Sequence, residues 1–227
     1  MIDESVGKIE VEFGGQRLLL LADRAVYWPA RETLLIADIH LGKGAAFRTA
    51  GVPVPSGATV KDLARLEVLL RTTRAQRLVV LGDFIHARDA RQPEVLESIA
   101  RWRRGHNVRI LLVRGNHDLR AGNVPAEWNI EEVEEPFAEG GMLLSHSPCS
   151  EDEPLPTLAG HIHPIFRMRD FDGTTVAVPC FVLDGNCFIL PAFGTFTGGE
   201  GVSMRPGRRI YVIAGGRVIP IRPDQKS

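Results

Sequence analysis

The sequence of 227 residues has few cysteines, no membrane-length hydrophobic run and no excess of charge of either sign. The spacing of Cys149, Cys180 and Cys187 matches neither a zinc ribbon nor a redox CxxC pair, and an odd number favours a reducing compartment. We interpret all three as packing residues. The apolar run 18–22 is far too short to span a bilayer, and no export signal is visible. A cytoplasmic protein is therefore expected.

Charge does not identify a partner, because 28 acidic residues nearly balance 27 Lys and Arg. Residues 61–109 hold eleven Lys or Arg against six Asp or Glu. A solvated helix surface explains this local excess better than a nucleic-acid footprint, because no dense basic run with interleaved aromatics is present.

Hydrophobic residues make up 44% of the chain, enough for one substantial core, and we expect a single domain over residues 1–227. Alternating residues 8–13, a Gly-Gly turn and residues 17–21 predict a hairpin. Helical spacing predicts helices over 59–70, where Thr59 and Asp62 resemble a capping pair, and over 93–104, with proline in the first turn. Apolar runs predict further strands over 33–37, 78–81, 108–113, 142–144, 175–183, 187–190, 209–214 and 217–221. Helices alternating with strands early and hairpins later favour an α/β sandwich with a mostly antiparallel second sheet.

Five separate apolar runs each end in residues that can bind a metal. Six of the seven histidines lie in or just after these segments. Side chains beyond the carboxyl ends of neighbouring strands converge on one crevice, so residues far apart in sequence can meet there. Each fragment alone is typical of a turn, but the set favours a metal site. The candidate ligands are Asp38, His40, Asp83, Asn116, His146, His161 and His163.

The donor types limit the metal. Imidazole, carboxylate and carboxamide groups without thiolate suit Mn²⁺, Fe or Zn²⁺ better than Ca²⁺ or a structural zinc. Two divalent ions need about seven protein ligands with one shared group, which leaves positions for water and substrate. The seven residues supply that set.

The order Asp-x-His, Gly-Asp, Gly-Asn-His-Asp, His and Gly-His-x-His resembles the calcineurin-like metallophosphoesterase superfamily from Asp38 to His163. The resemblance implies a four-layer α/β/β/α sandwich of two mixed sheets flanked by helices, and hydrolysis by a metal-bound hydroxide. It also implies that His117 contacts the phosphate or protonates the leaving oxygen, with Asp118 orienting it. One ion would take Asp38, His40 and His163, the other Asn116, His146 and His161, and Asp83 would bridge them.

One segment departs from the commonest family pattern. Residues 82–86 read Gly-Asp-Phe-Ile-His, where many members have Gly-Asp-x-x-Asp-Arg. His86 resembles the histidine of Gly-Asp-x-x-His in nuclease-like and nucleotide-cleaving members, where it would contact the substrate. Alternatively, it only caps or supports the site.

Residues 41–55 and 190–199 resemble signatures of the ligase-associated DNA damage response endonuclease family, and the resemblance covers nearly the full chain. It implies a bacterial or archaeal cytosolic protein in a DNA-repair setting, found with a DNA ligase, a helicase and an exonuclease. Lys43 and Arg48 either supply positive charge to a bound phosphate or lie on the surface of a short helix. Phe47, Phe193 and Phe196 can stack on a base, but packing is the favoured role.

Three hypotheses follow. The leading one is a manganese-preferring phosphodiesterase or endonuclease that acts on DNA, with single strands expected. The first alternative is a phosphoesterase for a nucleotide or cyclic nucleotide, favoured by the near-neutral charge. The second is a non-catalytic metal-binding scaffold for a repair partner, against which His117 and Asp118 argue.

Overall fold

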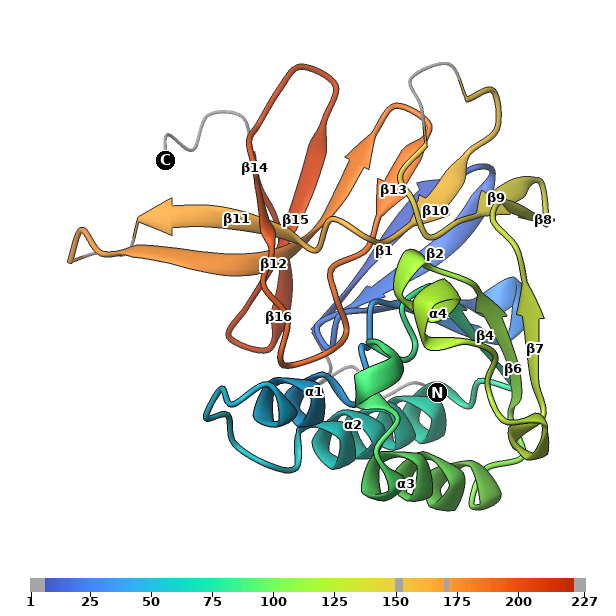
Figure 1. Ribbon diagram of the computed structural model, residues 1–227. Helices are drawn as coiled ribbons and strands as arrows, with labels where there is room; N and C mark the ends of the chain where they lie inside the picture. Colours follow the sequence, from blue (N-terminus) through green and yellow to red (C-terminus); the bar gives the residue numbers. More distant parts are fainter. Residues whose placement is uncertain (1–6, 150–152, 170–171, 223–227) are drawn as a thin grey trace.

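A computed structural model describes residues 7–149, 153–169 and 172–222, which form two β-sheets packed face to face with helices beside the first (Figure 1). In the first sheet the strands lie in sequence order. Pairing is antiparallel up to the fourth strand and parallel from there on. The strands are β1 (Lys8–Phe13), β2 (Gln16–Leu21), β3 (Ala25–Trp28), β4 (Thr33–Ala37), β5 (Arg77–Leu81), β6 (Arg109–Val113) and β7 (Ile130–Val133).

The second sheet is also mixed and has the order β14-β11-β12-β13-β10-β9-β8, with β15 and β16 joined to it through β12. Strand β10 runs parallel to both β9 and β13. The strands are β8 (Phe137–Glu139), β9 (Met142–Leu144), β10 (Thr157–Ala159), β11 (Pro164–Arg169), β12 (Thr175–Asp184), β13 (Cys187–Ile189), β14 (Glu200–Val202), β15 (Arg209–Ala214) and β16 (Arg217–Pro220).

The helices of the described ranges all precede β7. They are α1 (Lys43–Thr49), α2 (Ala58–Thr73), α3 (Pro93–Arg104) and α4 (Asn116–Ala121), with 3-10 turns η1 (Pro29–Arg31), η2 (Arg88–Ala90) and η3 (Ala126–Trp128). Apolar residues of α2 and α3 share one core cluster with the outer face of the first sheet. The expected pair of mixed sheets with flanking helices is therefore confirmed, and the helices are few.

The pleat of the strands divides the core into layers. In β4, Leu34 and Ile36 face the helices, whereas Leu35 and Ala37 face Phe181 and other residues of the second sheet. The central parallel strands are buried on both faces, so their sequences are continuous apolar runs. For this reason the sequence located these strands to within one residue.

The predicted hairpin, strands and helices are confirmed, with bounds that differ by no more than three residues. Strands β3, β7, β8, β11 and β14 were not predicted, and β10 was marked only as an apolar run that ends in candidate ligands. The interpretation of Cys180, Cys187 and Cys149 as packing residues is also confirmed, because the first two are buried in an apolar cluster and Cys149 packs against it.

The predicted capping pair on the second helix is wrong. Helix α2 begins after Gly57, and no side chain caps it. The Thr59 hydroxyl accepts a hydrogen bond from the Gly42 amide at 3.1 Å, and the Asp62 carboxylate accepts one from the Thr195 amide at 3.2 Å. Contacts with distant loops therefore occupy both side chains.

No helix of the described residues is long and apolar enough to cross a membrane.

Candidate metal centre

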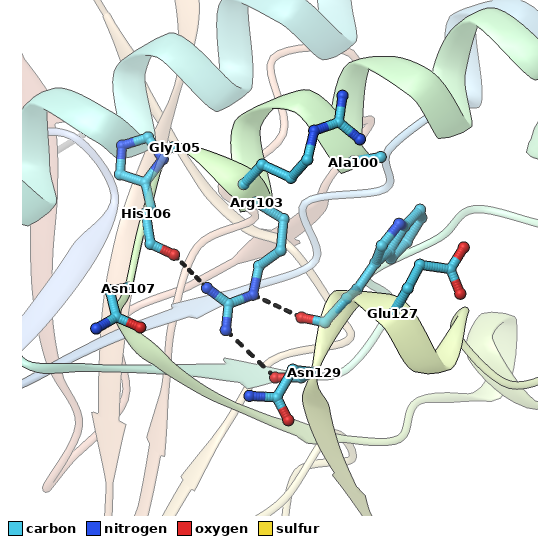
Figure 2. A pocket seen from close by; sticks show the side chains of 9 residues that line it. Ala100, Arg103, Gly105, His106, Asn107, Glu127 and Asn129 are labelled. Atoms are coloured by element: carbon cyan, nitrogen blue, oxygen red, sulfur yellow. Dashed lines mark hydrogen bonds between the residues drawn. The ribbon is translucent and has the colours of Figure 1, made fainter.

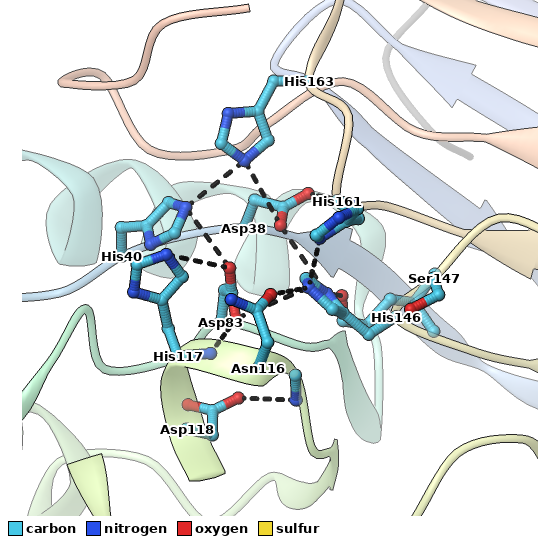
Figure 3. A network of polar contacts seen from close by, with 12 residues as sticks. Asp38, His40, Asp83, Asn116, His117, Asp118, His146, Ser147, His161 and His163 are labelled. Carbon is cyan, nitrogen blue, oxygen red and sulfur yellow. Dashed lines mark hydrogen bonds and ion pairs between the residues drawn. The ribbon is translucent and has the colours of Figure 1, made fainter. Parts of the chain in front are cut away.

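The seven predicted ligands meet at one end of the sandwich, and Figure 3 shows their side chains pointing toward one another. Strands β4, β5 and β6 of the first sheet and β9 and β10 of the second deliver them from their carboxyl ends. Parallel strands bring such ends to the same edge. The site therefore spans both sheets, with Asp38, His40, Asp83 and Asn116 from the first and His146, His161 and His163 from the second.

One group of donors surrounds Asp38. Nε2 of His163 lies 3.3 Å from Oδ1 of Asp38 and 3.3 Å from Nε2 of His40. Nε2 of His40 lies 3.6 Å from Oδ2 of Asp83. The donor atoms of Asp38, His40 and His163 are close enough together to share one cation.

A second group lies on the other side of Asp83. Nε2 of His146 lies 3.0 Å from Oδ1 of Asn116 and 2.9 Å from Nδ1 of His161. The same nitrogen lies 3.5 Å from Oδ1 of Asp83. The two carboxylate oxygens of Asp83 thus face different donor groups, which is the placement that a bridging ligand needs.

The backbone of five of these seven residues is left-handed. The φ angles are 54° for Asp38, 48° for His40, 55° for Asp83, 72° for His161 and 49° for His163. Each such non-glycine conformation costs about 1–3 kcal/mol, so the surrounding structure must hold it. Part of the support comes from the neighbouring turn, because the His40 amide donates to the Asp83 carbonyl at 2.8 Å and the Asp38 amide donates to Gly82 at 3.2 Å.

Glycine is required where the loops approach one another. A Cβ atom on Gly160 would lie 2.6 Å from both the Ala37 Cβ and Oδ2 of Asp38. The next amide, that of His161, donates to the same Asp38 oxygen at 2.8 Å. The absence of a side chain at Gly160 therefore lets the second sheet reach the first beside a candidate ligand.

The electrostatics of the site fit a pair of divalent cations. Asp38 and His146 are fully buried and Asp83 is 2% exposed. Oδ1 of Asp38 has no hydrogen-bond partner among the described residues, and an unpaired buried carboxylate is costly. Burial raises the pKa of Asp83 and lowers that of His40, so the imidazole of His40 keeps a free lone pair. Nitrogen and oxygen donors without thiolate suit Mn²⁺, Fe or Zn²⁺.

The structure corrects the role expected of Asp118. Its buried carboxylate accepts hydrogen bonds from the amides of Phe84 at 2.9 Å and Gly115 at 3.0 Å, and burial raises its pKa to about 6. It therefore joins the loops that carry Asp83 and Asn116. The group that orients the His117 ring is the His86 carbonyl, which accepts from Nδ1.

His86 supports the site from one side. Its Nδ1 lies 3.3 Å from Nδ1 of His40, and its ring stacks on His117 with centroids 4.6 Å apart. Burial, with the nearby charges of His117 and Lys43, lowers the pKa of His86 to about 4. A neutral His86 can accept a hydrogen bond at Nδ1 from the Nδ1–H of His40, which would fix the tautomer of that candidate ligand.

Lys43 and Arg48 differ in position although both lie on α1. Burial lowers the pKa of Lys43, while the carboxylates of Asp83 and Asp38 oppose the shift, which places the ammonium within electrostatic range of the donor cluster. Arg48 is exposed, and its guanidinium donates to the Pro55 carbonyl at 3.2 Å. Lys43 therefore interacts electrostatically with the carboxylates of the cluster, whereas Arg48 bonds to its own loop.

Sequence reasoning missed Glu135, which holds the loop carrying His146. Its carboxylate accepts from the His146 and Ser147 amides, both at 2.7 Å, and from the Ser145 hydroxyl at 2.8 Å. Nothing in a Glu-Pro pair before a strand signals this role. The carbonyl of Gly198, 3.2 Å from Nδ1 of His163, was missed for the same reason, since any residue has a carbonyl.

The seventh histidine, His106, lies in a different part of the molecule. It lines a pocket of about 520 Å³ at the carboxyl end of α3 (Figure 2). Its ring stacks on Trp102, and the guanidinium of Arg103 donates to the carbonyls of Trp128, His106 and Asn129. The guanidinium of Arg103 already donates to three backbone carbonyls and is not free to bind a ligand. We therefore assign the chemistry to the donor cluster and not to this pocket.

A cluster of buried carboxylates and imidazoles at the strand ends of a two-sheet sandwich is typical of metal-dependent hydrolases. The sequence model of the calcineurin-like phosphoesterase family matches residues 32–216. The chain therefore belongs to the calcineurin-like phosphoesterase family and is a metal-dependent phosphoesterase. This confirms the superfamily resemblance and favours an enzyme over the non-catalytic scaffold.

A solved structure of high similarity agrees with this assignment. The crystal structure of the nuclease MPE from Pseudomonas putida is 43% identical, with a TM-score of 0.82, covering 94% of this chain and 100% of that one. The protein of unknown function AQ665 from Aquifex aeolicus is 21% identical with a TM-score of 0.37, covering 58% of this chain and 78% of its own, too distant to support an inference. No curated protein matches the chain significantly.

We expect Gly160→Ala to weaken binding of Mn²⁺ by roughly 10- to 100-fold, the range seen when groups that position a metal ligand are disturbed. The new methyl group would displace Ala37 or Asp38. Isothermal titration of the metal-free protein measures the effect. Gly201→Ala is the matched control, because a Cβ there makes only an ordinary contact, 3.7 Å from Nη1 of Arg167. Equal affinities in the two variants would contradict the close-approach argument.

We expect Glu135→Gln to destabilise the fold by about 1–3 kcal/mol at pH 7, because charge-assisted hydrogen bonds are lost. Burial raises the pKa of Glu135, but hydrogen bonds from Ser147, Ser145 and His146 outweigh it and lower the pKa overall. The stabilisation is thus present above the unfolded pKa of about 4.3 and disappears as pH falls through the lower folded value.

Denaturant unfolding of both proteins across pH measures this difference. Glu97→Gln, which removes an exposed ion pair to Arg101, is the control and should change stability little. A difference between wild type and Glu135→Gln that persists unchanged below pH 3 would refute the assignment.

Proposed function

We propose that the protein is a Mn²⁺-dependent phosphodiesterase that cuts DNA internally, with single strands as its substrate, in a DNA-repair context. The observation that carries the proposal is the convergence of seven nitrogen and oxygen donors in two groups that meet at Asp83. The nuclease among the similar structures supports nucleic acid as substrate. The branch resemblance of residues 41–55 and 190–199 supports the repair context, a cytoplasmic location, and association with a DNA ligase, a helicase and an exonuclease.

The proposed ligand sets follow the two donor groups. Asp38, His40 and His163 hold one ion, Asn116, His146 and His161 hold the other, and Asp83 joins them. When bound, the ions supply Lewis acidity to the phosphate oxygens and lower the pKa of water to about 7. Manganese is proposed ahead of iron and zinc because the donors include carboxylates and a carboxamide but no thiolate.

Two side chains of the proposed site act on the substrate directly. The carbonyl of His86 can only accept, so Nδ1 of His117 carries a proton and Nε2 is the nitrogen that exchanges one. In the imidazolium form His117 donates that proton to the departing oxygen, and the neutral ring remains. Lys43 binds a phosphate oxygen through its ammonium, and Asp118 keeps the two loops in place.

The rim of the site is accessible. His161 is exposed, and the side chains of His117 and His163 are 26% and 16% exposed, while the donors beneath them are buried. A substrate can therefore reach the cluster from solvent. Access of this kind also suits a mononucleotide or cyclic nucleotide, which is the alternative substrate class.

We expect Asp83→Ala to lower kcat/KM for a single-stranded oligonucleotide in Mn²⁺ by more than roughly 100-fold, because even groups behind a metal ligand are worth about 10- to 100-fold. Gel analysis of a labelled circular single strand measures internal cleavage. The control is His106→Ala, which removes an imidazole far from the cluster and should retain activity. The nuclease proposal fails if the Mn²⁺-loaded wild type cleaves only phosphomonoesters.

Competition separates the two substrate classes. With a bis-aryl phosphate ester as reporter, a nuclease is inhibited by long single strands and hardly by mononucleotides, and the reverse holds for the small-molecule enzyme. The inhibition by long strands should weaken as salt rises, because phosphate contacts release counterions.

We expect His117→Ala to lower kcat for DNA by about 10²- to 10⁴-fold while leaving Mn²⁺ binding unchanged, since its proposed role is proton transfer. A nitrophenyl ester has a leaving group that needs no proton, so its kcat should fall much less. Steady-state kinetics on both substrates, with metal titration, measures this split. An equal loss on both substrates would show that His117 does not protonate the leaving oxygen.

A further inference from the structure

Two phenylalanines stand at the rim of the metal centre. Phe47 lies on α1, and Phe196 lies in the loop between β13 and β14. Their rings meet edge to face, with centroids 5.5 Å apart and planes at 84°. Phe47 is also nearly parallel to His86 at 6.4 Å, and His86 stacks on His117. A row of rings therefore leads from His117 to Phe196.

The exposure of Phe196 does not come from a loose loop. Phe196 is 37% exposed, whereas Phe193, three residues earlier, is fully buried beneath the Arg65 guanidinium. On either side of Phe196, the Thr195 amide donates to Asp62 at 3.2 Å and the Thr197 hydroxyl donates to the Gly194 carbonyl at 3.0 Å. The anchored loop thus presents one aromatic side chain to solvent at low entropic cost on binding.

Phe47 and the positively charged Lys43 lie on one side of α1. Lys43 and Phe47 are four residues apart, a spacing that places them on the same helix face. Lys43 interacts electrostatically with Asp38 and Asp83, whereas the ring of Phe47 packs against Phe196. Along this face of α1, a cation is followed by aromatic rings. A nucleotide matches this arrangement, because its phosphate can bind the cation while its base stacks on a ring.

We infer that Phe196 and Phe47 form a stacking face for an unpaired nucleobase next to the phosphodiester held at the metal centre. This inference rests on the proposed function. Stacking on aromatic side chains tolerates any base, because every base has a π face, and it needs a base whose face is free. In a duplex, neighbouring pairs cover those faces, so the ring pair selects single strands without reading sequence.

A fluorescent base tests the inference independently of cleavage. A short single-stranded oligonucleotide containing 2-aminopurine is mixed with the Mn²⁺-loaded protein in a stopped-flow instrument, and fluorescence is followed before the strand is cut. Stacking quenches 2-aminopurine, so we expect quenching with wild type. Phe196→Ala should abolish it and weaken binding about tenfold. Phe196→Trp should restore both.

The matched control is Val68→Ala, which removes an exposed apolar side chain from the half of α2 remote from the centre. It should bind and quench as wild type does. An oligonucleotide with an abasic residue in place of the stacked base should bind wild type and Phe196→Ala equally. Phe47→Ala, with circular dichroism to confirm folding, should resemble Phe196→Ala.

The outcomes separate this inference from the proposed function. Unchanged quenching and unchanged discrimination against the abasic strand in Phe196→Ala, with Mn²⁺-dependent cleavage intact, mean that the rings only pack against each other and overturn the stacking face. Absence of quenching in wild type overturns it as well. Loss of DNA cleavage in every protein, wild type included, refutes the nuclease proposal instead.

Discussion

Two buried carboxylates, Asp38 and Asp83, set the conditions for the rest of the structure. Neither can lose its charge in an apolar interior without altering the site, and neither can keep it there unpaired. The imidazoles of His40, His146 and His163 approach them but carry no charge when neutral. Cations are the groups that satisfy both requirements, so binding of metal and stability of the fold are coupled.

The local backbone is arranged to permit this concentration of charge. Left-handed turns at the strand ends aim short side chains back into the crevice, and glycines at the crossing points let two sheets come within contact distance. Strained conformations elsewhere would simply lower stability. At this site, backbone hydrogen bonds between the turn after β4 and the turn after β5 hold the left-handed residues in place. The carboxylate of Asp118 adds further hydrogen bonds to the neighbouring loops. Strain and support are therefore found at the same place, as is common at functional sites.

Much of the fold and of the candidate site could be predicted from sequence, for a physical reason. Strands β4, β5 and β6 are buried on both faces, so each is an unbroken apolar run, and the polar residue that ends it is conspicuous. Side chains used in tertiary contacts carry no such local signal. Asp62 has the spacing of a cap but binds the loop at Thr195, Asp118 follows His117 yet bonds to Phe84, and Glu135 acts across ten residues. Edge strands such as β14 are short and exposed and lack periodicity.

The donor cluster takes four of its members from one sheet and three from the other. Consequently, the geometry of the cluster depends on how the two sheets pack against each other. The layer of Leu35, Phe181 and Phe188 between the sheets acts as a spacer. A small change in the thickness of that spacer would pull donors of each group apart long before it unfolded the chain, because both groups take donors from both sheets. Apolar substitutions in this core, although remote from the donors, therefore change the spacing of the donors as well as the packing.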